Sequence, residues 1–317
     1  MQVITDLTQR PWADQRSVIT IGAYDGVHRG HRAVIGEVKQ LAEQLSCRSV
    51  VVTFDRHPAS IVRPESAPKL LTDLDQKLEL LALTGVDATV LVRFDERQSF
   101  ESATDFVERV LVQCLATRTV VVGADFHFGR QRSGNVALLR ELGLIHDFDV
   151  FPRELVPRSD GVDEPISSTA IRRALAGGLV EMAGEMLGHA YEVRGSVVKG
   201  DQRGRQLGFP TANVEVSNQI CMPADGVYAG WYERPNGDVH PCAINLGRRP
   251  TFYEHADHSL LEAHLLDFNG DLYGETARVR FTHFLRSERK FDGIDALVFQ
   301  LKHDIEHARA SISSLPR

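Results

Sequence analysis

At 317 residues, with 43% hydrophobic and 25% charged residues, the chain has the length and composition of a globular protein of two ordinary-sized domains. Its 36 Lys and Arg against 43 Asp and Glu give a net charge of −7, which argues against nucleic acid as a partner because such binding draws on a basic face. Four widely spaced cysteines without a C-x-x-C pair favour a reduced setting over a disulfide framework. No apolar run approaches the length of a membrane span, and residues 1–12 lack a signal-peptide pattern. We therefore expect a cytoplasmic protein with no membrane partner, and the sequence leaves its oligomeric state open.

The first chemically informative stretch is residues 22–31 (GAYDGVHRGH), which separates an apolar, β-branched run at Ser17–Ile21 from a helical pattern that begins near Arg32. A glycine-rich turn between a strand and a helix leaves backbone N–H groups at the helix N-terminus, where the helix dipole favours an anion. His28 and His31 add two imidazoles. The pattern predicts a phosphate site; the alternative is a polar loop with two surface histidines. The candidate residues are Gly22, Asp25, His28 and His31.

The first half of the chain continues as an alternation of strands and helices. In chain order we expect a helix to about Leu45, a strand at 48–54, a helix capped by Thr72 or Asp73 and running to Leu83, a strand at 88–92, a helix from Ser102 to about Leu115 and a strand at 119–123. The strands are continuous apolar runs of the kind that a parallel sheet buries on both faces. This alternation predicts a doubly wound α/β domain.

Two further loops follow strands of this domain, at residues 53–58 (TFDRHP) and 123–130 (GADFHFGR). Ligands of doubly wound domains bind at the carboxyl ends of the strands, so we expect both loops to meet the stretch 22–31 at one edge of the sheet. Each loop taken singly is equally well read as an ordinary turn. The third loop contributes Asp125, Phe126 and Phe128 as candidates.

A helix start rich in hydroxyl groups follows at residues 166–173 (ISSTAIRR). Ser and Thr favour the N-cap, and Arg offers a planar donor fork for phosphate oxygens, so Ser168, Thr169 and Arg172 are candidates for a triphosphate site. The alternative is a capped helix with two solvated arginines. Two familiar phosphate motifs are absent, because the chain contains neither a G-x-G arrangement nor a Gly-Lys pair.

The second half changes to short strand-like segments with turn residues between them, which predicts an antiparallel barrel or sandwich. Asn236-Gly237 is a hairpin signal, and a helix from about Ile294 to Ser311 is expected to close the domain. The segments run at 191–198, 226–232, 242–246, 260–267 and 277–284. We place the boundary so that residues 1–186 and 187–317 form the two domains.

The motifs of this half are glycine-rich and basic at residues 195–200 (GSVVKG) and 204–213 (GRQLGFPTAN). Such glycines allow the backbone to approach phosphates, and the side-chain oxygens of Thr211 and Asn213 are suited to Mg²⁺; the alternative is a connection between strands. Glu262, in an otherwise apolar strand, is either a paired structural carboxylate or a group that takes a proton. Three histidines, His255, His258 and His264, are weak evidence for a metal site.

Several motifs in both halves of the chain are similar to those of a known family. The loops H-R-G-H, T-F-D-R-H-P, G-A-D-F-H-F-G and S-S-T-A-I-R are similar, in this order, to the adenylyltransferase half of the prokaryotic FAD synthetases, which are bifunctional riboflavin kinases/FMN adenylyltransferases. The run G-R-Q-L-G-F-P-T-A-N, with D-G-V-Y-A-G, N-L-G-R-R-P-T-F and F-L-R-S-E-R-K-F, resembles their riboflavin kinase half. Tyr24 stands where the first motif usually has Phe, and Arg56 where the second usually has Pro.

The resemblance implies a nucleotidyltransferase domain of Rossmann-like fold and a six-stranded kinase barrel with a C-terminal helix. It implies riboflavin, FMN, ATP, FAD and pyrophosphate as the small molecules bound, with Mg²⁺ as the metal. Glu262 is then the general base of the kinase, while His28, His31 and Arg172 stabilise charge in the adenylyl transfer. The kinase residues that it assigns to nucleotide or flavin binding are Gly195, Lys199, Gly200, Arg205, Gly208, Pro210 and Arg286.

Two alternatives stay open on the sequence. The departures at Tyr24 and Arg56 are consistent with a weakened adenylyltransferase, which would leave a riboflavin kinase. A flavin or nucleotide sensor without turnover is the other, although it predicts loss of Glu262 or of the histidines, and all of them are present.

Overall fold

The computed structural model describes residues 1–200, 203–247 and 260–313. The chain divides into two compact units, Met1–Ser168 and Thr169–Arg317, which are described here one at a time. Helices α7 (Ser168–Ala176) and α8 (Val180–Leu187) fall almost wholly in the second unit, because α8 packs on the barrel: the Phe284 backbone N–H donates to Glu181 on α8. The domain boundary near residue 187 stays a prediction.

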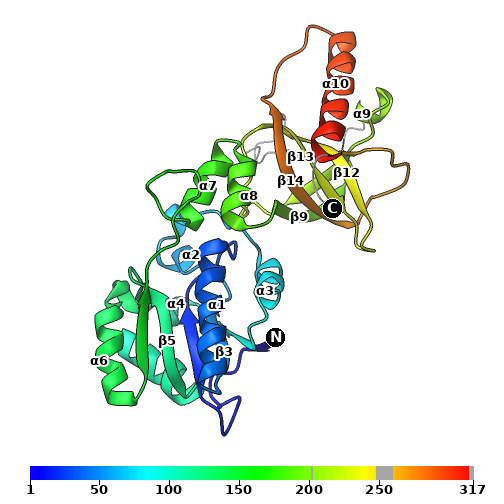
Figure 1. The fold of residues 1–317 in the computed structure, drawn as a ribbon. Helices are drawn as coiled ribbons and strands as arrows, with labels where there is room; N and C mark the ends of the chain where they lie inside the picture. The colour runs from blue at the N-terminus through cyan, green and yellow to red at the C-terminus, as the bar shows by residue number, and fades with distance from the viewer. Residues whose placement is uncertain (201–202, 248–259, 314–317) are drawn as a thin grey trace. The chain divides into compact units, whose positions relative to one another are not determined.

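The first unit is built on an all-parallel sheet of six strands in the order β1-β4-β3-β2-β5-β8 (Figure 1). The strands are β1 (Gln2–Ile4), β2 (Ser17–Ile21), β3 (Arg48–Phe54), β4 (Ala88–Val92), β5 (Thr117–Gly123) and β8 (Asp149–Arg153). Residues 18–19, 50–52 and 120–122 are almost wholly buried, since helices cover both faces of the sheet. The doubly wound fold is therefore confirmed.

The strand order places a switch point between β2 and β5. From β2 the chain moves outward through β3 and β4, and it then returns to add β5 and β8 on the other side of β2. Parallel sheets of this kind bind ligands beyond the carboxyl ends of the strands that flank such a point. The loops at 22–28 and 124–130 follow these two strands, so topology alone brings both predicted loops to one crevice.

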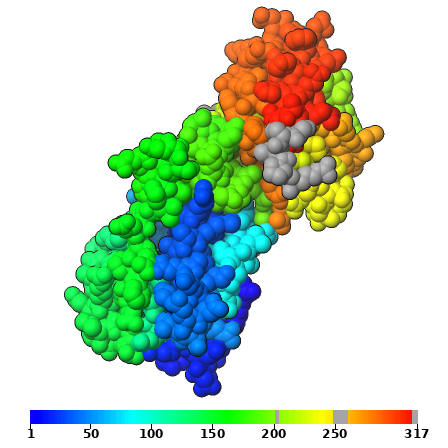
Figure 2. Space-filling view, viewed as in Figure 1, coloured from blue at the N-terminus to red at the C-terminus, as the bar shows by residue number. Residues whose placement is uncertain are grey.

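Helices connect the strands of the first unit. They are α1 (Arg29–Gln44), α2 (Ala59–Val62), η1 (Pro64–Ser66), α3 (Leu74–Ala82), α4 (Glu96–Ser99), α5 (Ala103–Phe106), the π-helical η2 (Val107–Cys114), η3 (Arg130–Arg132) and α6 (Val136–His146). Helix α1 crosses one face of the sheet, and its side chains cover the strands there (Figure 2). Its buried stripe, Ile35, Val38 and Ala42, has the helical spacing expected of an amphipathic helix.

Local signals define these helices well. Asp73, and not Thr72, caps α3 by accepting a hydrogen bond from the Gln76 N–H, and Ser102 caps α5 in the same way. The helix expected from Ser102 to about Leu115 is present but becomes π-helical after Phe106. Strands β1 and β8 and helix α6 were not among the expected elements.

The second unit is a closed, antiparallel barrel in the order β10-β13-β12-β11-β14-β9. Its strands are β9 (Tyr191–Val198), β10 (Ala212–Val216), β11 (Gly226–Glu233), β12 (Val239–Gly247), β13 (Leu260–Leu265) and β14 (Thr276–Arg286), with α9 (Arg203–Gln206) after β9 and α10 (Ile294–Ser313) at the end. The barrel, rather than a sandwich, is confirmed, together with the C-terminal helix. Alternate residues such as Val193, Tyr232 and Ile244 fill the interior.

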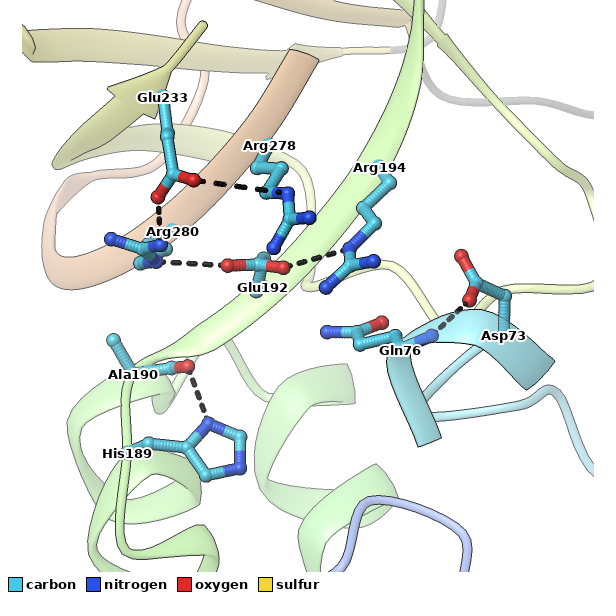
Figure 3. Close-up of polar contacts among 9 residues, drawn as sticks. All are labelled: Asp73, Gln76, His189, Ala190, Glu192, Arg194, Glu233, Arg278 and Arg280. Carbon is cyan, nitrogen blue, oxygen red and sulfur yellow. Dashed lines mark hydrogen bonds and ion pairs between the residues drawn. The ribbon is translucent and has the colours of Figure 1, made fainter. Parts of the chain in front are cut away.

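Opposite charges stabilise the outer face of the barrel where β9, β14 and β11 pair (Figure 3). Glu192 lies between Arg194 and Arg280, with oxygen–nitrogen distances of 2.9 and 2.8 Å. Glu233 pairs in turn with Arg280 and Arg278. Cross-strand charge pairs of this kind reinforce register, because a slip by one residue would bring these carboxylates to the apolar interior.

Candidate active sites

The first candidate site is centred on two stacked imidazoles at the N-terminus of α1. His28 is the N-cap residue, and its Nδ1 accepts a hydrogen bond of 3.3 Å from the His31 backbone N–H. The two rings stack with centroids 3.5 Å apart and an interplanar angle of 17°. Because His28 is 5% exposed and caps the helix through Nδ1, both rings are held where the helix dipole attracts an anion.

His31 is held in its neutral form. Burial lowers its pKa well below 6.5, and the adjacent His28 lowers it further. Its Nδ1 is buried and has no hydrogen-bond partner among the residues that the structure describes. A buried polar atom without a partner is unusual and is consistent with a group that interacts with a bound ligand.

The loop before the histidines has an unusual backbone. Tyr24, Gly26 and Val27 all have positive φ, at 50°, 82° and 38°. Glycine adopts this region freely, whereas a β-branched residue such as Val27 does so only when its surroundings hold it there. The Tyr24 hydroxyl, buried, is 2.6 Å from the Thr20 hydroxyl, so the aromatic residue that departs from the family motif has its oxygen paired.

Asp25 fastens this loop to the chain before α3. Its carboxylate accepts hydrogen bonds of 3.0 Å from the backbone N–H groups of Leu71 and Thr72. Asp25 thus lies in the candidate site as expected, with its oxygens used in holding the loop. A direct contact between Asp25 and a nucleotide stays a prediction.

Two glycines leave room for the rings of this loop. A Cβ built on Gly30 would lie 3.2 Å from the His28 ring, and one built on Gly22 would lie 3.1 Å from the Tyr24 ring. Both contacts are tighter than ordinary van der Waals contact. Gly22 therefore leaves the space in which the Tyr24 ring packs against the backbone.

The loop after β3 is also tied down at the same edge. Asp55 accepts from the Phe94 backbone N–H at 2.8 Å and pairs with Arg56 at 3.1 Å. His57 Nδ1 accepts from the Ala59 N–H. Arg56 is half exposed, so the replacement of the family's proline falls on a surface side chain paired with its neighbour.

The loop after β5 folds into a small hairpin, with β6 (His127–Phe128) paired to β7 (Gly134–Asn135). Phe126 and Phe128 stack with centroids 5.4 Å apart, and Phe128 is buried against Phe106. Asp125 is exposed. Of these candidates Phe128 packs in the core, whereas Phe126 is half-buried, and contact of Phe126 and Asp125 with a ligand stays a prediction.

Ser168 joins this site, and two other candidates lie beyond it in the chain. The Ser168 hydroxyl donates to the Asp25 carbonyl oxygen at 3.0 Å. Thr169, exposed, and Arg172, half-buried, follow on α7 in the second compact unit. The role of Arg172 beside the histidines stays a prediction.

The second candidate site follows from strand register on the barrel. Glu262 of β13 is directly opposite Asn213 of β10 on one side and Asn245 of β12 on the other. Residues directly opposite in antiparallel strands project from the same face with Cβ atoms about 5 Å apart. Because Leu261 and Ala263 point to the interior, this row of a carboxylate between two amides lies on the outer face.

Asn213 has the properties of a metal or phosphate ligand. It is 7% exposed, and its Oδ1 has no hydrogen-bond partner among the described residues. A Cβ built on Gly200 would lie 2.6 Å from Asn213 Nδ2, so this glycine allows the backbone to pass directly over the amide. Thr211 lies one residue before β10. The orphaned amide oxygen and the nearby hydroxyl fit a hard cation such as Mg²⁺.

The other kinase candidates differ in their surroundings. Gly195 is inside β9, where the Glu215 carbonyl oxygen leaves no space for a side chain, so its absence of Cβ has a packing reason. Gly208, with a φ of 86°, lies two residues after the end of α9, and the Pro210 carbonyl oxygen is 2.7 Å from His264 Nδ1. Lys199 and Arg205 are exposed.

Arg286 forms a structural ion pair. Its guanidinium donates to both carboxylate oxygens of Asp304 on α10, at 2.7 to 3.1 Å, and to the Ser287 carbonyl oxygen. Asp304 is 4% exposed, and Gln300 donates to it as well. This network ties the end of β14 to the C-terminal helix; contact between Arg286 and a ligand stays a prediction.

Sequence reasoning missed two residues with a place in these sites. Asn245 is part of the quoted N-L-G-R-R-P-T-F motif, but only register shows it opposite Glu262. Lys77 of α3 is 7% exposed and bonds to the main-chain oxygens of Ala23, in the loop after β2, and of Phe54, the last residue of β3. No short motif marks it, and only the helical spacing of Lys77 with the apolar positions of α3 indicated that it faces inward.

The described residues contain no group of three or more His, Cys, Asp and Glu side chains arranged to hold a metal ion. His255 and His258 lie outside the described residues. Within residues 1–200, 203–247 and 260–313, none of the helices combines the length and apolarity needed to cross a membrane.

Fold and sites together define a class: a nucleotidyltransferase-type α/β unit followed by a six-stranded barrel of the riboflavin kinase type. The family model described as FAD synthetase matches residues 10–170, and the one described as riboflavin kinase matches residues 187–312. The chain belongs to the family of bifunctional riboflavin kinase/FMN adenylyltransferases, as the motifs indicated.

Relatives bearing this name cover almost the whole chain. The one from Listeria monocytogenes is 37% identical and covers 98% of this chain and 96% of its own. The one from Escherichia coli K12 is 38% identical, with 96% and 95% covered. A crystal structure described as that of a macrolide-efflux protein from Streptococcus pneumoniae superposes with a TM-score of 0.85 at 30% identity, covering 98% of this chain and 99% of that one.

Proposed function

We propose that this chain carries out both reactions named for its family: the barrel unit phosphorylates riboflavin to FMN with ATP, and the α/β unit transfers the AMP moiety of ATP to FMN, which yields FAD and pyrophosphate. The observation that supports this most is that each unit holds its own set of polar groups suited to one reaction. The stacked histidines lie at a helix N-terminus in one unit, and the carboxylate lies between two amides in the other.

In the kinase reaction, Glu262 accepts the proton of the riboflavin 5′-hydroxyl, and the oxygen attacks the γ-phosphate of ATP, with ADP leaving. Thr211 and Asn213 would hold Mg²⁺, which would neutralise charge on the phosphates of ATP. The half-buried position of Glu262 on the outer face of the barrel suits a base that substrate reaches from solvent. Gly200 lets the backbone approach the phosphates beside Asn213.

In the adenylyl transfer, the FMN phosphate attacks the α-phosphate of ATP, and the bond to pyrophosphate breaks. The attacking group is already an anion, so no side chain has to remove a proton from it. His28, His31 and Arg172 instead stabilise charge on the α-phosphate and the leaving group. The neutral state of His31 is compatible with this role, because a neutral imidazole still donates one hydrogen bond.

The test is to incubate the purified protein with riboflavin, ATP and Mg²⁺ and to separate the flavins over time. We expect FMN first and FAD later. FMN alone would favour the riboflavin kinase with a weakened adenylyltransferase, and bound flavin without turnover would favour the sensor. The Tyr24 hydroxyl is paired and Arg56 is exposed, so neither departure from the family motifs leaves a buried polar group without a partner. This favours two intact sites.

A further inference from the structure

A buried lysine contacts the loop after β2, which leads to His28 and His31. Lys77, in the first turns of α3, is 7% exposed, and its Nζ is 2.6 Å from the Phe54 carbonyl oxygen and 3.5 Å from the Ala23 carbonyl oxygen. Phe54 is the last residue of β3, and Ala23 lies in the loop that follows β2. One ammonium group therefore contacts the two strand ends that border the candidate site.

The chain just before α3 makes a second contact with the loop after β2. Asp25, two residues after Ala23, accepts from the backbone N–H groups of Leu71 and Thr72 just before α3. The Thr53 hydroxyl donates to the Ala23 carbonyl oxygen at 3.1 Å. The loop is thus held on both sides of Tyr24, the first of its residues with positive φ.

The charge of Lys77 is balanced in place. Burial lowers its pKa to about 8, while Asp25 in the loop after β2 and Asp55 in the loop after β3 oppose the shift. Asp55 also pairs with Arg56, and the first loop further contains the titratable groups of Tyr24, His28 and His31. Burying an ammonium is costly, so a lysine at this position is expected to have a role that an apolar side chain does not fill.

We propose that Lys77 is a positioning residue for the adenylyl transfer: by donating to the Ala23 and Phe54 carbonyl oxygens, it holds the loop that carries His28 and His31 in its reactive geometry. The inference rests on the proposed function of that site. Small displacements of charge-stabilising groups are costly in catalysis, so loss of this contact affects the rate more than it affects folding.

The first measurement compares Lys77→Met with Lys39→Met. Lys39 of α1 makes a similar contact away from the site, donating to the Thr84 carbonyl oxygen at 2.7 Å. We expect Lys77→Met to lower kcat for FAD formation from supplied FMN by about tenfold or more while FMN formation is unchanged, and Lys39→Met to alter neither. Equal FAD formation by wild type and Lys77→Met, or equal losses in both variants, would overturn the proposal.

The second measurement uses only the wild-type protein, so it does not depend on a variant that folds. FAD formation by the wild type should fall as the pH rises through about 8, because Lys77 then loses its charge and its hydrogen bonds to the two carbonyl oxygens weaken, while the substrate phosphates are already ionised above about pH 7. FMN formation in the same samples controls for general effects of alkali. A rate of FAD formation that stays level to pH 9 would refute the role of Lys77. A wild type that makes no FAD at all would refute the proposed function instead.

Discussion

The rings of His28 and His31 lie face to face, 3.5 Å between centroids, while the Nδ1 of the first accepts the backbone N–H of the second. Two imidazolium ions in this arrangement would repel each other strongly, so at most one of the two rings is positively charged. The stack and the hydrogen bond couple the positions of the two side chains, so a change at one histidine affects the other. It also determines how the pair responds to substitution and to acid.

Replacement of His31 by Ala should lower FAD formation by about 100-fold or more and leave FMN formation intact. Removing one preorganised donor from a charge-stabilising site costs on the order of 100-fold in kcat. Flavin separation after supplying FMN or riboflavin measures both steps. His146→Ala, in the last turn of α6, is the matched control. Equal loss of both activities would show that the two sites are not separate.

The α/β unit should lose stability in acid. The pKa of His31 is lowered in the folded protein, so the unfolded chain takes up a proton near pH 6.5 that the folded chain does not bind. The contribution of this group is present above about pH 6.5 and is lost as the pH falls toward the lowered value. The chain has two tryptophans, so Trp231→Phe leaves Trp12, packed on the core of the α/β unit, to report its unfolding. In that background His31→Asn should flatten the dependence on pH; unchanged slopes would contradict the assignment.

Tyr24→Phe restores the residue usual in the family motif and should leave the rate of FAD formation unchanged. The hydroxyl that it removes is buried and bonds to Thr20, so the cost is about 1 kcal/mol of stability. Steady-state kinetics and thermal unfolding measure the two effects. A large gain in FAD formation would instead mark Tyr24 as the cause of a weakened adenylyltransferase.

Glu262→Gln should lower FMN formation by about 100-fold or more, because an amide cannot accept the proton of the riboflavin hydroxyl. FAD formation from supplied FMN should continue at the wild-type rate. Glu306→Gln, on the exposed side of α10, makes the same chemical change away from the row that contains Glu262. Retained kinase activity in Glu262→Gln would remove this residue from its role.

Gly200→Ala should damage the kinase through Asn213. The added methyl would lie 2.6 to 2.7 Å from three atoms of the Asn213 amide, which then has to leave its position beside Glu262. We expect a higher Mg²⁺ requirement and about tenfold slower FMN formation, with adenylyl transfer unchanged. Gly36→Ala on α1 meets no atom within 4 Å and should gain about 0.5–1 kcal/mol of stability. Normal kinase activity in Gly200→Ala would argue against Asn213 as a ligand.

Local pattern was sufficient for much of the fold. The apolar run at Arg48–Phe54 coincides with β3, the Asn236-Gly237 turn joins β11 to β12, and Ser102 caps its helix. Each of these signals depends on neighbours within a few residues, which the sequence displays directly.

Long-range contacts decided the rest. β10 looked like a connection, because it becomes a strand only by pairing with β9 and β13. The resemblance assigns Arg286 to nucleotide or flavin binding, and only the folded chain shows that Asp304 of α10 pairs with it. The partners of Lys77, the carbonyl oxygens of Ala23 and Phe54, lie 54 and 23 residues away in the chain. Which polar atoms are buried and with what they pair is a property of elements that meet only after folding, so the motifs indicated the candidate sites, whereas the tertiary structure assigned the contacts within them.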